Sequence, residues 1–202
     1  IQVLFDVKPV VTLFDYINGH KKLQDVIIET KYPNLSLIAG KSGYQYATNS
    51  SSFIFSRLVQ DILDLNFYDI LIVDTGAGLN DYVKEFLKVS TNILAITSTD
   101  PSALTDVYSL IKMLAIDKKS LMLCFNHTKN ELVGETISNS LINLAKKNRL
   151  KSEFVIKYIG SVPSSENITK IARARKIFVN EFPQEDAAIK LHNIVDGVLK
   201  NI

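Results

Sequence analysis

Short apolar runs alternate with longer amphipathic stretches along most of the chain. Five of these runs lack the polar alternation of a half-exposed strand, a pattern that indicates strands covered on both faces. They are rich in Ile, Val, Leu or Phe and lie at residues 35–39, 69–74, 92–97, 121–126 and 154–160. Apolar residues at helical spacing predict helices over 52–65, 81–89, 101–114, 130–147, 166–173 and 185–200.

Helices are also predicted at both ends of the chain. Gly19 separates two short helices predicted over residues 13–18 and 23–29. The last predicted helix, residues 185–200, has only Lys190 and Lys200 on its polar face and no Phe or Trp anchor. We therefore expect it to pack on the domain and not on a membrane. The alternation as a whole predicts one α/β domain over residues 1–202, with a mainly parallel sheet, right-handed crossovers and helices on both faces.

The composition is consistent with this fold and argues against several kinds of protein. Apolar residues make up 47% of the 202-residue chain and charged residues 22%, as in an ordinary globular protein. The near balance of 23 basic and 21 acidic residues gives no indication of nucleic-acid binding. The single cysteine, Cys124, excludes an internal disulfide, and the three histidines have no metal-ligand spacing. No apolar run is long enough to span a bilayer.

The most specific chemistry lies at the end of the predicted strand 69–74. Ligands of parallel sheets bind beyond the carboxyl ends of the strands. There, the carboxylate of Asp74 is followed at once by Gly76 and Gly78. Such a carboxylate orients Mg²⁺ through a water molecule, and a glycine-flanked backbone can approach a terminal phosphate closely. The alternative is an aspartate that caps a tight strand-to-helix turn.

Three further strand ends carry polar residues. Asn126 offers a donor and an acceptor that suit the edge of an adenine, or it closes the strand as an Asn turn. The loop that begins at Pro163 and Ser164 can present backbone groups to a base. The hydroxyl-rich segment 97–106 either belongs to the site or is simply the cap of a helix, with Asp100 as the N-cap residue.

Taken in this order, the segments resemble the MinD/ParA branch of P-loop ATPases, which have a deviant Walker A loop. Within that branch they resemble the MinD-like flagellar number regulators of the FlhG (YlxH) type. Three stretches carry the resemblance: Asp-Thr-Gly-Ala-Gly at 74–78, the Asp-Pro-Ser-Ala helix start within 97–106, and Thr-Leu-Phe-Asp at 12–15. The resemblance implies a three-layer α/β fold and an ATPase that uses ATP and Mg²⁺.

The resemblance also implies roles for individual residues. Asp74 would be the catalytic residue and would hold the metal through water. The nucleotide-binding residues would be Thr75, Gly76, Gly78, Asn126, Pro163 and Ser164. ATP would close a homodimer, with Asp100, Ser102 and Asp106 in the interface.

Partners and location follow from the same resemblance. It implies contacts with the flagellar GTPase FlhF and with proteins of the flagellar C-ring or regulators of flagellar genes. No nucleic acid is expected as a partner. The expected location is the cytoplasm, with possible peripheral contact at the inner face of the cell membrane.

Two departures from the family pattern change the expectation. The sequence holds no Gly-x-x-x-x-Gly-Lys-[Ser/Thr] motif and no Lys-Gly-Gly variant of it, and it begins without Met. We therefore expect the C-terminal two-thirds of such an ATPase, without its first strands and inactive alone. Many relatives have an aspartate soon after the proline of the last loop, where this chain has Ser164 and Ser165.

Two other function classes stay open. A nucleotide-independent α/β interaction module is one alternative. A receiver-type domain phosphorylated on Asp74 is the other, but it requires an acidic pair at an earlier strand end, and residues 39–41 provide none.

Overall fold

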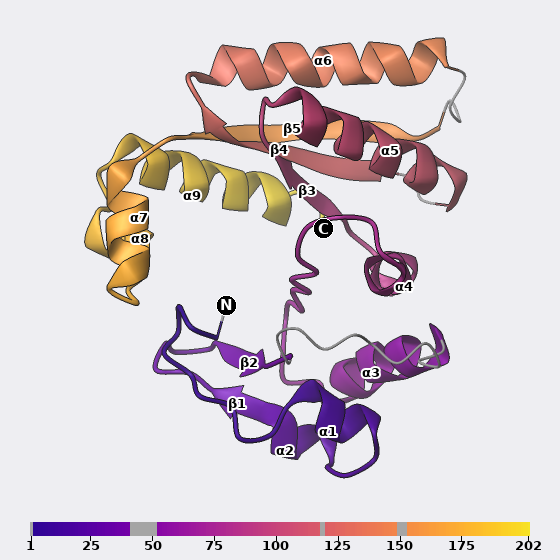
Figure 1. Ribbon diagram of the computed structural model, residues 1–202, viewed down its shortest axis with the longest axis vertical. Helices are drawn as coiled ribbons and strands as arrows, with labels where there is room; N and C mark the ends of the chain where they lie inside the picture. The colour runs from indigo at the N-terminus through magenta and orange to yellow at the C-terminus, as the bar shows by residue number, and fades with distance from the viewer. Residues whose placement is uncertain (1, 41–51, 118–119, 149–152) are drawn as a thin grey trace. The chain divides into compact units, whose positions relative to one another are not determined.

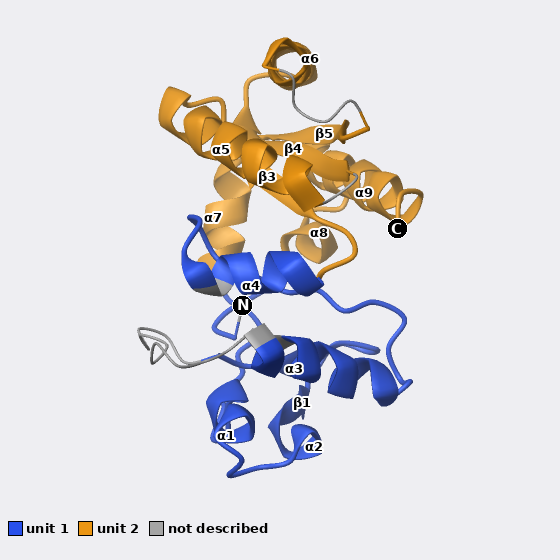
Figure 2. Ribbon diagram, turned by 90° about the vertical axis from the view of Figure 1, so that its right-hand side faces the viewer, with its two compact units in different colours: residues 1–89, 174–176 blue, residues 90–173, 177–202 orange. Residues whose placement is uncertain are grey.

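The computed structural model describes residues 2–40, 52–117, 120–148 and 153–202. Two compact units make up the chain: residues 1–89 with 174–176, and residues 90–173 with 177–202 (Figure 2). We refer to them as unit 1 and unit 2 and describe each by itself. The organisation of residues 1–202 as one domain stays a prediction.

Unit 1 is built from short helices and one small hairpin. Its elements are α1 (Leu13–Ile17), α2 (Leu23–Val26), β1 (Ile27–Glu29), β2 (Ser36–Ile38), α3 (Ser52–Asp64) and α4 (Asp81–Val89). Strands β1 and β2 pair antiparallel, and α3 packs on α4. The core is apolar throughout and consists of Leu13, Leu23, Val26, Leu58, Ile62 and Phe86.

The helix predicted over residues 23–29 is wrong in its second half. The helix ends at Val26, and Ile27 pairs with Ile38 as the first rung of the hairpin. Ile27 and Ile28 are β-branched, and such side chains favour strands when a partner strand is available. Asn34 has a left-handed backbone (φ 62°) in the connection between the two strands, which Asn tolerates.

The strand predicted over residues 69–74 is absent as well. These residues form neither helix nor strand, and no described residue pairs with them in a sheet. Ile70, Leu71 and Ile72 are 49%, 40% and 82% exposed. An apolar run becomes a strand only when a neighbouring strand accepts and donates its backbone hydrogen bonds. In the described residues this run has no such neighbour.

Unit 2 contains a three-stranded parallel sheet in the order β3–β4–β5. The strands are β3 (Leu94–Thr97), β4 (Ser120–Thr128) and β5 (Val155–Pro163). Helix α5 (Pro101–Asp117) packs on β3 and β4, and α6 (Glu131–Lys147) packs on β4 and β5. Helix α9 (Asp186–Leu199) packs on β5, on the opposite side of the sheet from α6 (Figure 1). Helices α7 (Glu166–Arg173) and α8 (Phe178–Glu181) connect β5 to α9.

Strand β4 is the centre of unit 2. Leu121, Leu123 and Phe125 have no exposed surface, as expected for a strand with neighbours on both edges and helices on both faces. Helix α6 approaches the sheet closely at Gly134, where an added Cβ would lie 2.1 Å from the Ser161 hydroxyl. The predicted fold class, a parallel sheet with helices on both faces, is confirmed.

The last helix also agrees with its prediction. Ala187, Ala188 and Ile194 of α9 are buried against the unit 2 core. Within the part of the chain that the structure describes, no helix is both long and apolar enough to cross a membrane.

Candidate functional site

The Asp74 loop in unit 1 connects the exposed apolar run to helix α4. Gly76 and Gly78 both have left-handed backbones (φ 72° and 89°), a conformation that glycine adopts readily because it has no Cβ. An added Cβ at either position would meet no atom within 4 Å, so the loop backbone is open on that side. This combination lets another molecule come close to the loop backbone.

The Asp74 carboxylate makes one long hydrogen bond to the described residues. Its Oδ1 accepts a long hydrogen bond, 3.4 Å, from the Gly76 N–H, and the side chain is exposed. Helix α4 is capped by another residue: the Val83 N–H donates to Asn80 Oδ1 at 3.0 Å. Asp74 therefore does not cap α4, but its bond to the Gly76 N–H closes a local turn, as the alternative interpretation foresees in part.

Asp74 fits a magnesium ion as a single ligand. Mg²⁺ prefers oxygen donors and usually takes one or two carboxylates, with waters and substrate phosphates in its other positions. Among the described residues, no three His, Cys, Asp or Glu side chains converge as a metal site. Water and nucleotide phosphates would therefore provide the remaining ligands.

The segment before α5 is held by its own side chains. The Ser98 hydroxyl donates to Asp100 Oδ2 at 2.6 Å, and the Asp100 N–H donates to Ser98 Oγ at 3.3 Å. The Asp100 carboxylate thus closes a local turn, as the capping alternative foresees in part. Ser102 and Asp106 lie on the exposed surface of the first two turns of α5.

The ends of β4 and β5 in unit 2 bring three predicted residues together. Asn126 pairs with Val162 along the sheet, and a bulge at His127, whose backbone is left-handed (φ 57°), follows it. Asn126 Oδ1 accepts from the His127 N–H at 2.9 Å. Pro163 lies beside Thr128 at the end of the ladder. These contacts leave the half-buried Asn126 amide at the sheet edge next to the loop that begins at Pro163 and Ser164.

The loop after β5 is attached at two points. On one side, Ser164 Oγ lies 3.4 Å from His127 Nδ1. On the other, Ser165 and Asn167 both donate to the carboxylate of Glu185. Neither His127 nor Glu185 is among the residues predicted from the sequence. No short motif connects Glu185 to a loop about 20 residues away, so only the folded chain shows the contact.

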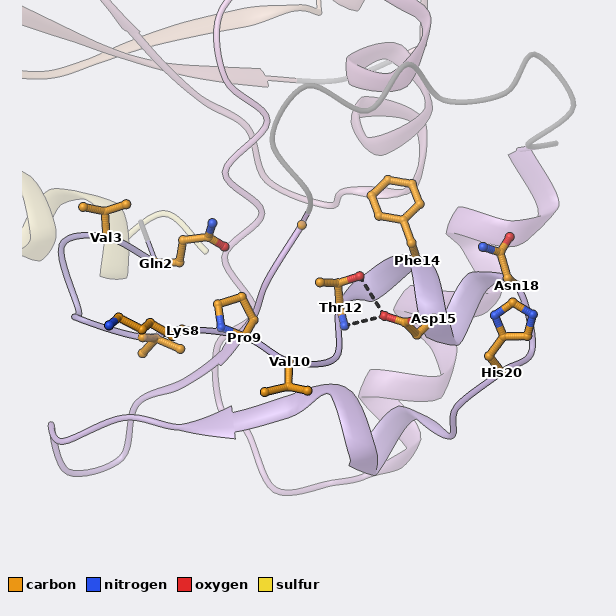
Figure 3. Close-up of a pocket in the computed structure, with 12 residues that line it drawn as sticks. Gln2, Val3, Lys8, Pro9, Val10, Thr12, Phe14, Asp15, Asn18 and His20 are labelled. Atoms are coloured by element: carbon orange, nitrogen blue, oxygen red, sulfur yellow. Dashed lines mark hydrogen bonds between the residues drawn. The ribbon is translucent and has the colours of Figure 1, made fainter.

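A separate pocket lies in unit 1 and contains none of the predicted site residues. Figure 3 shows it between the N-terminal segment and α1, with Lys8, Thr12, Asp15 and His20 among its lining residues. Asp15 accepts from the Thr12 N–H at 2.8 Å and from the Thr12 hydroxyl at 2.9 Å, which completes a capping box. These bonds lower the pKa of Asp15. The Thr12 and Asp15 side chains are thus explained by helix capping.

Comparison with solved structures defines the fold. The chain superposes on the cell division ATPase MinD of Pyrococcus furiosus with a TM-score of 0.80 and 16% identity, covering all of this chain and 81% of that one. MinD of Pyrococcus horikoshii, solved as a complex with Mg-ADP, gives a TM-score of 0.76 with 16% identity over 98% of this chain and 77% of that one. The fold is that of the MinD/ParA class of P-loop ATPases.

In sequence, the chain is similar to a flagellum site-determining protein and to an antiactivator. It is 31% identical over 186 residues to the flagellum site-determining protein YlxH of Helicobacter pylori, covering 92% of this chain. It is 27% identical over 202 residues to the antiactivator FleN of Pseudomonas aeruginosa, covering 98% of this chain. The chain spans 62% of the length of YlxH and 70% of FleN. No protein-family model matches the sequence. The resemblance to MinD-like proteins of the FlhG type is confirmed.

Proposed function

We propose that the chain is part of a MinD-like ATP-binding switch that controls the number and placement of flagella. One observation carries the proposal: the open, glycine-flanked Asp74 loop occurs on a fold shared with MinD. The name of one relative, a flagellum site-determining protein, supports the cellular process, and the name of the other, an antiactivator, supports a regulatory role.

We assign the phosphate side of the nucleotide to the Asp74 loop. ATP supplies the phosphoryl group, and Mg²⁺ supplies the positive charge that neutralises the phosphates. Asp74 would hold a water bound to Mg²⁺ through its free carboxylate oxygen. Gly76 and Gly78, together with Thr75, let backbone N–H groups lie against the terminal phosphate, because no side chain of the two glycines intervenes.

We assign the base side to the ends of β4 and β5. The Asn126 amide makes no hydrogen bond through its Nδ2 to the described residues, so this donor is available to an adenine nitrogen. Pro163 and Ser164 supply the rigid loop beside it. The Asn126 oxygen, which already accepts from His127, keeps the amide in one orientation.

The 202-residue chain does not contain a complete phosphate cradle, since its sequence has no Gly-x-x-x-x-Gly-Lys-[Ser/Thr] motif. On its own it is therefore expected to neither bind ATP tightly nor hydrolyse it. Calorimetry with MgATP tests the proposal on the full-length protein and on the 202-residue chain. A dissociation constant near 1 µM, about −8 kcal/mol, is expected for the full-length protein only. Micromolar binding of MgATP by the 202-residue chain would contradict the expectation that this chain does not contain the complete phosphate site.

The switch itself is a nucleotide-dependent homodimer in this proposal. Asp100, Ser102 and Asp106, at the start of α5, belong to its interface. Asp106→Lys changes an exposed residue, so the melting temperature is expected to stay within a few degrees, because exposed substitutions cost about 0.5 kcal/mol or less. Sedimentation of the full-length variant with MgATP is expected to show monomer only. An unchanged dimer fraction would remove Asp106 from the interface.

Partners and location complete the proposal. A partner that recognises only the ATP-bound dimer would report the nucleotide state. The flagellar GTPase FlhF, C-ring proteins and transcriptional regulators are the proposed partners. One solved neighbour is the complex of MinD with MinC from Aquifex aeolicus, which illustrates a MinD-like fold bound to a partner protein. Peripheral contact with the membrane is proposed for the full-length protein only.

A second candidate function is an interaction module that works without nucleotide. The exposed apolar side chains of Ile70 and Ile72 favour it, because such residues often mark contact surfaces. The same calorimetry separates the two candidates. If the full-length protein does not bind MgATP, the interaction module becomes the better explanation.

A further inference from the structure

Glu185 occupies the N-cap position of helix α9 but does not cap it. Its backbone is extended (φ −73°, ψ 142°), as an N-cap requires, yet its side chain makes no capping hydrogen bond. Its backbone carbonyl accepts from the Ala188 N–H at 2.8 Å, so the helix begins there without help from the carboxylate. Ser, Thr, Asp or Asn at this position normally accepts a hydrogen bond from one of the first N–H groups of the helix. The Glu185 carboxylate instead accepts hydrogen bonds from residues outside α9.

Both oxygens of that carboxylate bind the connection from β5 into α7. The Ser165 hydroxyl donates to Oε1, and Asn167 Nδ2 donates to Oε2 at 2.9 Å. The Asn167 N–H also donates to Ser165 Oγ at 3.1 Å, which joins the two donors to each other. One carboxylate therefore fixes the loop residue Ser165 and the α7 residue Asn167, which are 20 and 18 positions away in the sequence.

The loop has a second attachment on its other side. Ser164 Oγ lies 3.4 Å from Nδ1 of His127, the residue that follows Asn126 at the end of β4. Because Ser164 is fixed toward β4 and Ser165 toward α9, the backbone between Pro163 and Asn167 is held from both directions. Hydrogen bonds to an ionised carboxylate are roughly twice as strong as those between neutral groups. The Glu185 side of this arrangement is therefore the stronger one.

The charge state of Glu185 suits this role. Hydrogen bonds from Ser165 and Asn167 lower the pKa of the Glu185 carboxyl group, so it stays ionised at neutral pH. Glu185 is partly exposed, and no basic side chain forms an ion pair with it among the described residues. The stabilisation of the charge comes from the loop alone.

We propose that Glu185 is a positioning residue that holds residues 163–167, from the end of β5 to the first turn of α7, in the conformation that receives the nucleotide base. The inference rests on the proposed function, because it assumes that this loop and Asn126 form the base side of the site. Glu185 itself touches no nucleotide. It acts through Ser165 and Asn167, and its loss leaves the phosphate side unchanged.

The test uses Glu185→Ala and Glu185→Gln in the full-length protein, with Asp186→Ala as the matched control. Asp186 is the neighbouring carboxylate in the first turn of α9, and it makes no hydrogen bond to the loop. Glu185→Ala is expected to raise the KM for ATP about tenfold, with kcat within about twofold of the wild type. Glu185→Gln keeps one acceptor oxygen, so its KM for ATP is expected to lie between that of Glu185→Ala and that of the wild type. Asp186→Ala is expected to match the wild type.

Two readouts distinguish base-side positioning from a purely structural role. Inorganic tripolyphosphate carries the phosphates without a base, so its affinity is expected to be the same for Glu185→Ala and the wild type. Amide hydrogen exchange in residues 164–168 is expected to accelerate in Glu185→Ala without any nucleotide. An equal loss of affinity for tripolyphosphate and ATP, or a fall in kcat together with the melting temperature, would overturn the positioning role.

The outcome for Glu185 is separable from the outcome for the proposed function. If the wild-type protein neither binds nor hydrolyses ATP, the proposed function fails, and the base-side role fails with it. If the wild type uses ATP normally but Glu185→Ala has an unchanged KM, only the inference on Glu185 is overturned. Unchanged hydrogen exchange in the loop would show that Glu185 does not hold it at all.

Discussion

Two apolar runs with the same sequence pattern end in opposite environments. Residues 121–125 form the core of strand β4, and each has 4% exposure or less. Residues 70–72 are equally apolar but form no strand and are 40% to 82% exposed. The difference lies in the neighbours: β4 has a paired strand on each edge, and the run before Asp74 has none in the described residues.

This contrast shows what an apolar run specifies. It records that a segment is suited to burial on both faces, but the strand itself exists only through hydrogen bonds with its neighbours. Unit 2 supplies those neighbours to β4, together with the helices that cover it. The contrast therefore predicts that stability resides in the buried strand, whereas the exposed run and its loop contribute mainly chemistry.

The largest expected effect is on the stability of unit 2. Leu123→Ala removes three carbons from a side chain with no exposed surface, so it is expected to cost about 2–5 kcal/mol in the free energy of unfolding. Ile72→Ala removes the same number of carbons at a position that is 82% exposed, and about 0.5 kcal/mol or less is expected. Urea denaturation of the 202-residue chain compares the two. Equal losses would show that residues 70–72 are buried in solution.

The next effect concerns the contact between α6 and the sheet. Gly134→Ala places a methyl group 2.1 Å from Ser161 Oγ, which is buried and 2.7 Å from the Tyr158 hydroxyl. The overpacking is expected to cost about 1–3 kcal/mol. Gly40→Ala is the control, because an added Cβ there meets nothing within 4 Å.

Combining Gly134→Ala with Ser161→Ala sharpens this prediction. The second change removes the hydroxyl that the new methyl group meets, so the double variant is expected to recover part of the loss. Thermal unfolding of the wild type, the two single variants and the double variant measures the recovery. A fully stable Gly134→Ala single variant would mean that α6 lies farther from β5 than the structure shows.

The smallest expected effects come from removing one helix cap in each unit, and they test whether the two units unfold together. Asn80 caps α4 in unit 1 and Asn130 caps α6 in unit 2, each by accepting a hydrogen bond from the N–H three residues later. Replacing either with Ala is expected to cost about 1 kcal/mol. If residues 1–202 form one domain, both variants shift the same calorimetric transition. Two transitions, each shifted by only one variant, would contradict the single-domain prediction.

Most of the fold of unit 2 could be predicted from the sequence. Helix α7 has the predicted bounds, and strands β4 and β5 extend the predicted runs by only a few residues. The apolar runs and helical spacing carry this information because both faces of the sheet are covered by the same chain. Unit 1 was less predictable, since residues 27–29 pair as a strand with residues 36–38 only after a turn brings them together.

The candidate site residues could be proposed from the polar positions that follow apolar runs, but the contacts around them could not be predicted. Asp74 and Asn126 stand out because polar residues follow apolar runs directly. His127 and Glu185 gave no such signal. One depends on a left-handed bulge and the other on contacts across about 20 residues, and neither feature has a local sequence pattern.

The central claim is that Asp74 is needed for ATP turnover but not for the fold. The most direct measurement is the ATPase rate of the full-length protein carrying Asp74→Asn, which keeps the size of the side chain and removes its charge. We predict a fall in kcat of about 100-fold or more, with a melting temperature equal to that of the wild type. A normal rate in a normally folded variant would contradict the claim.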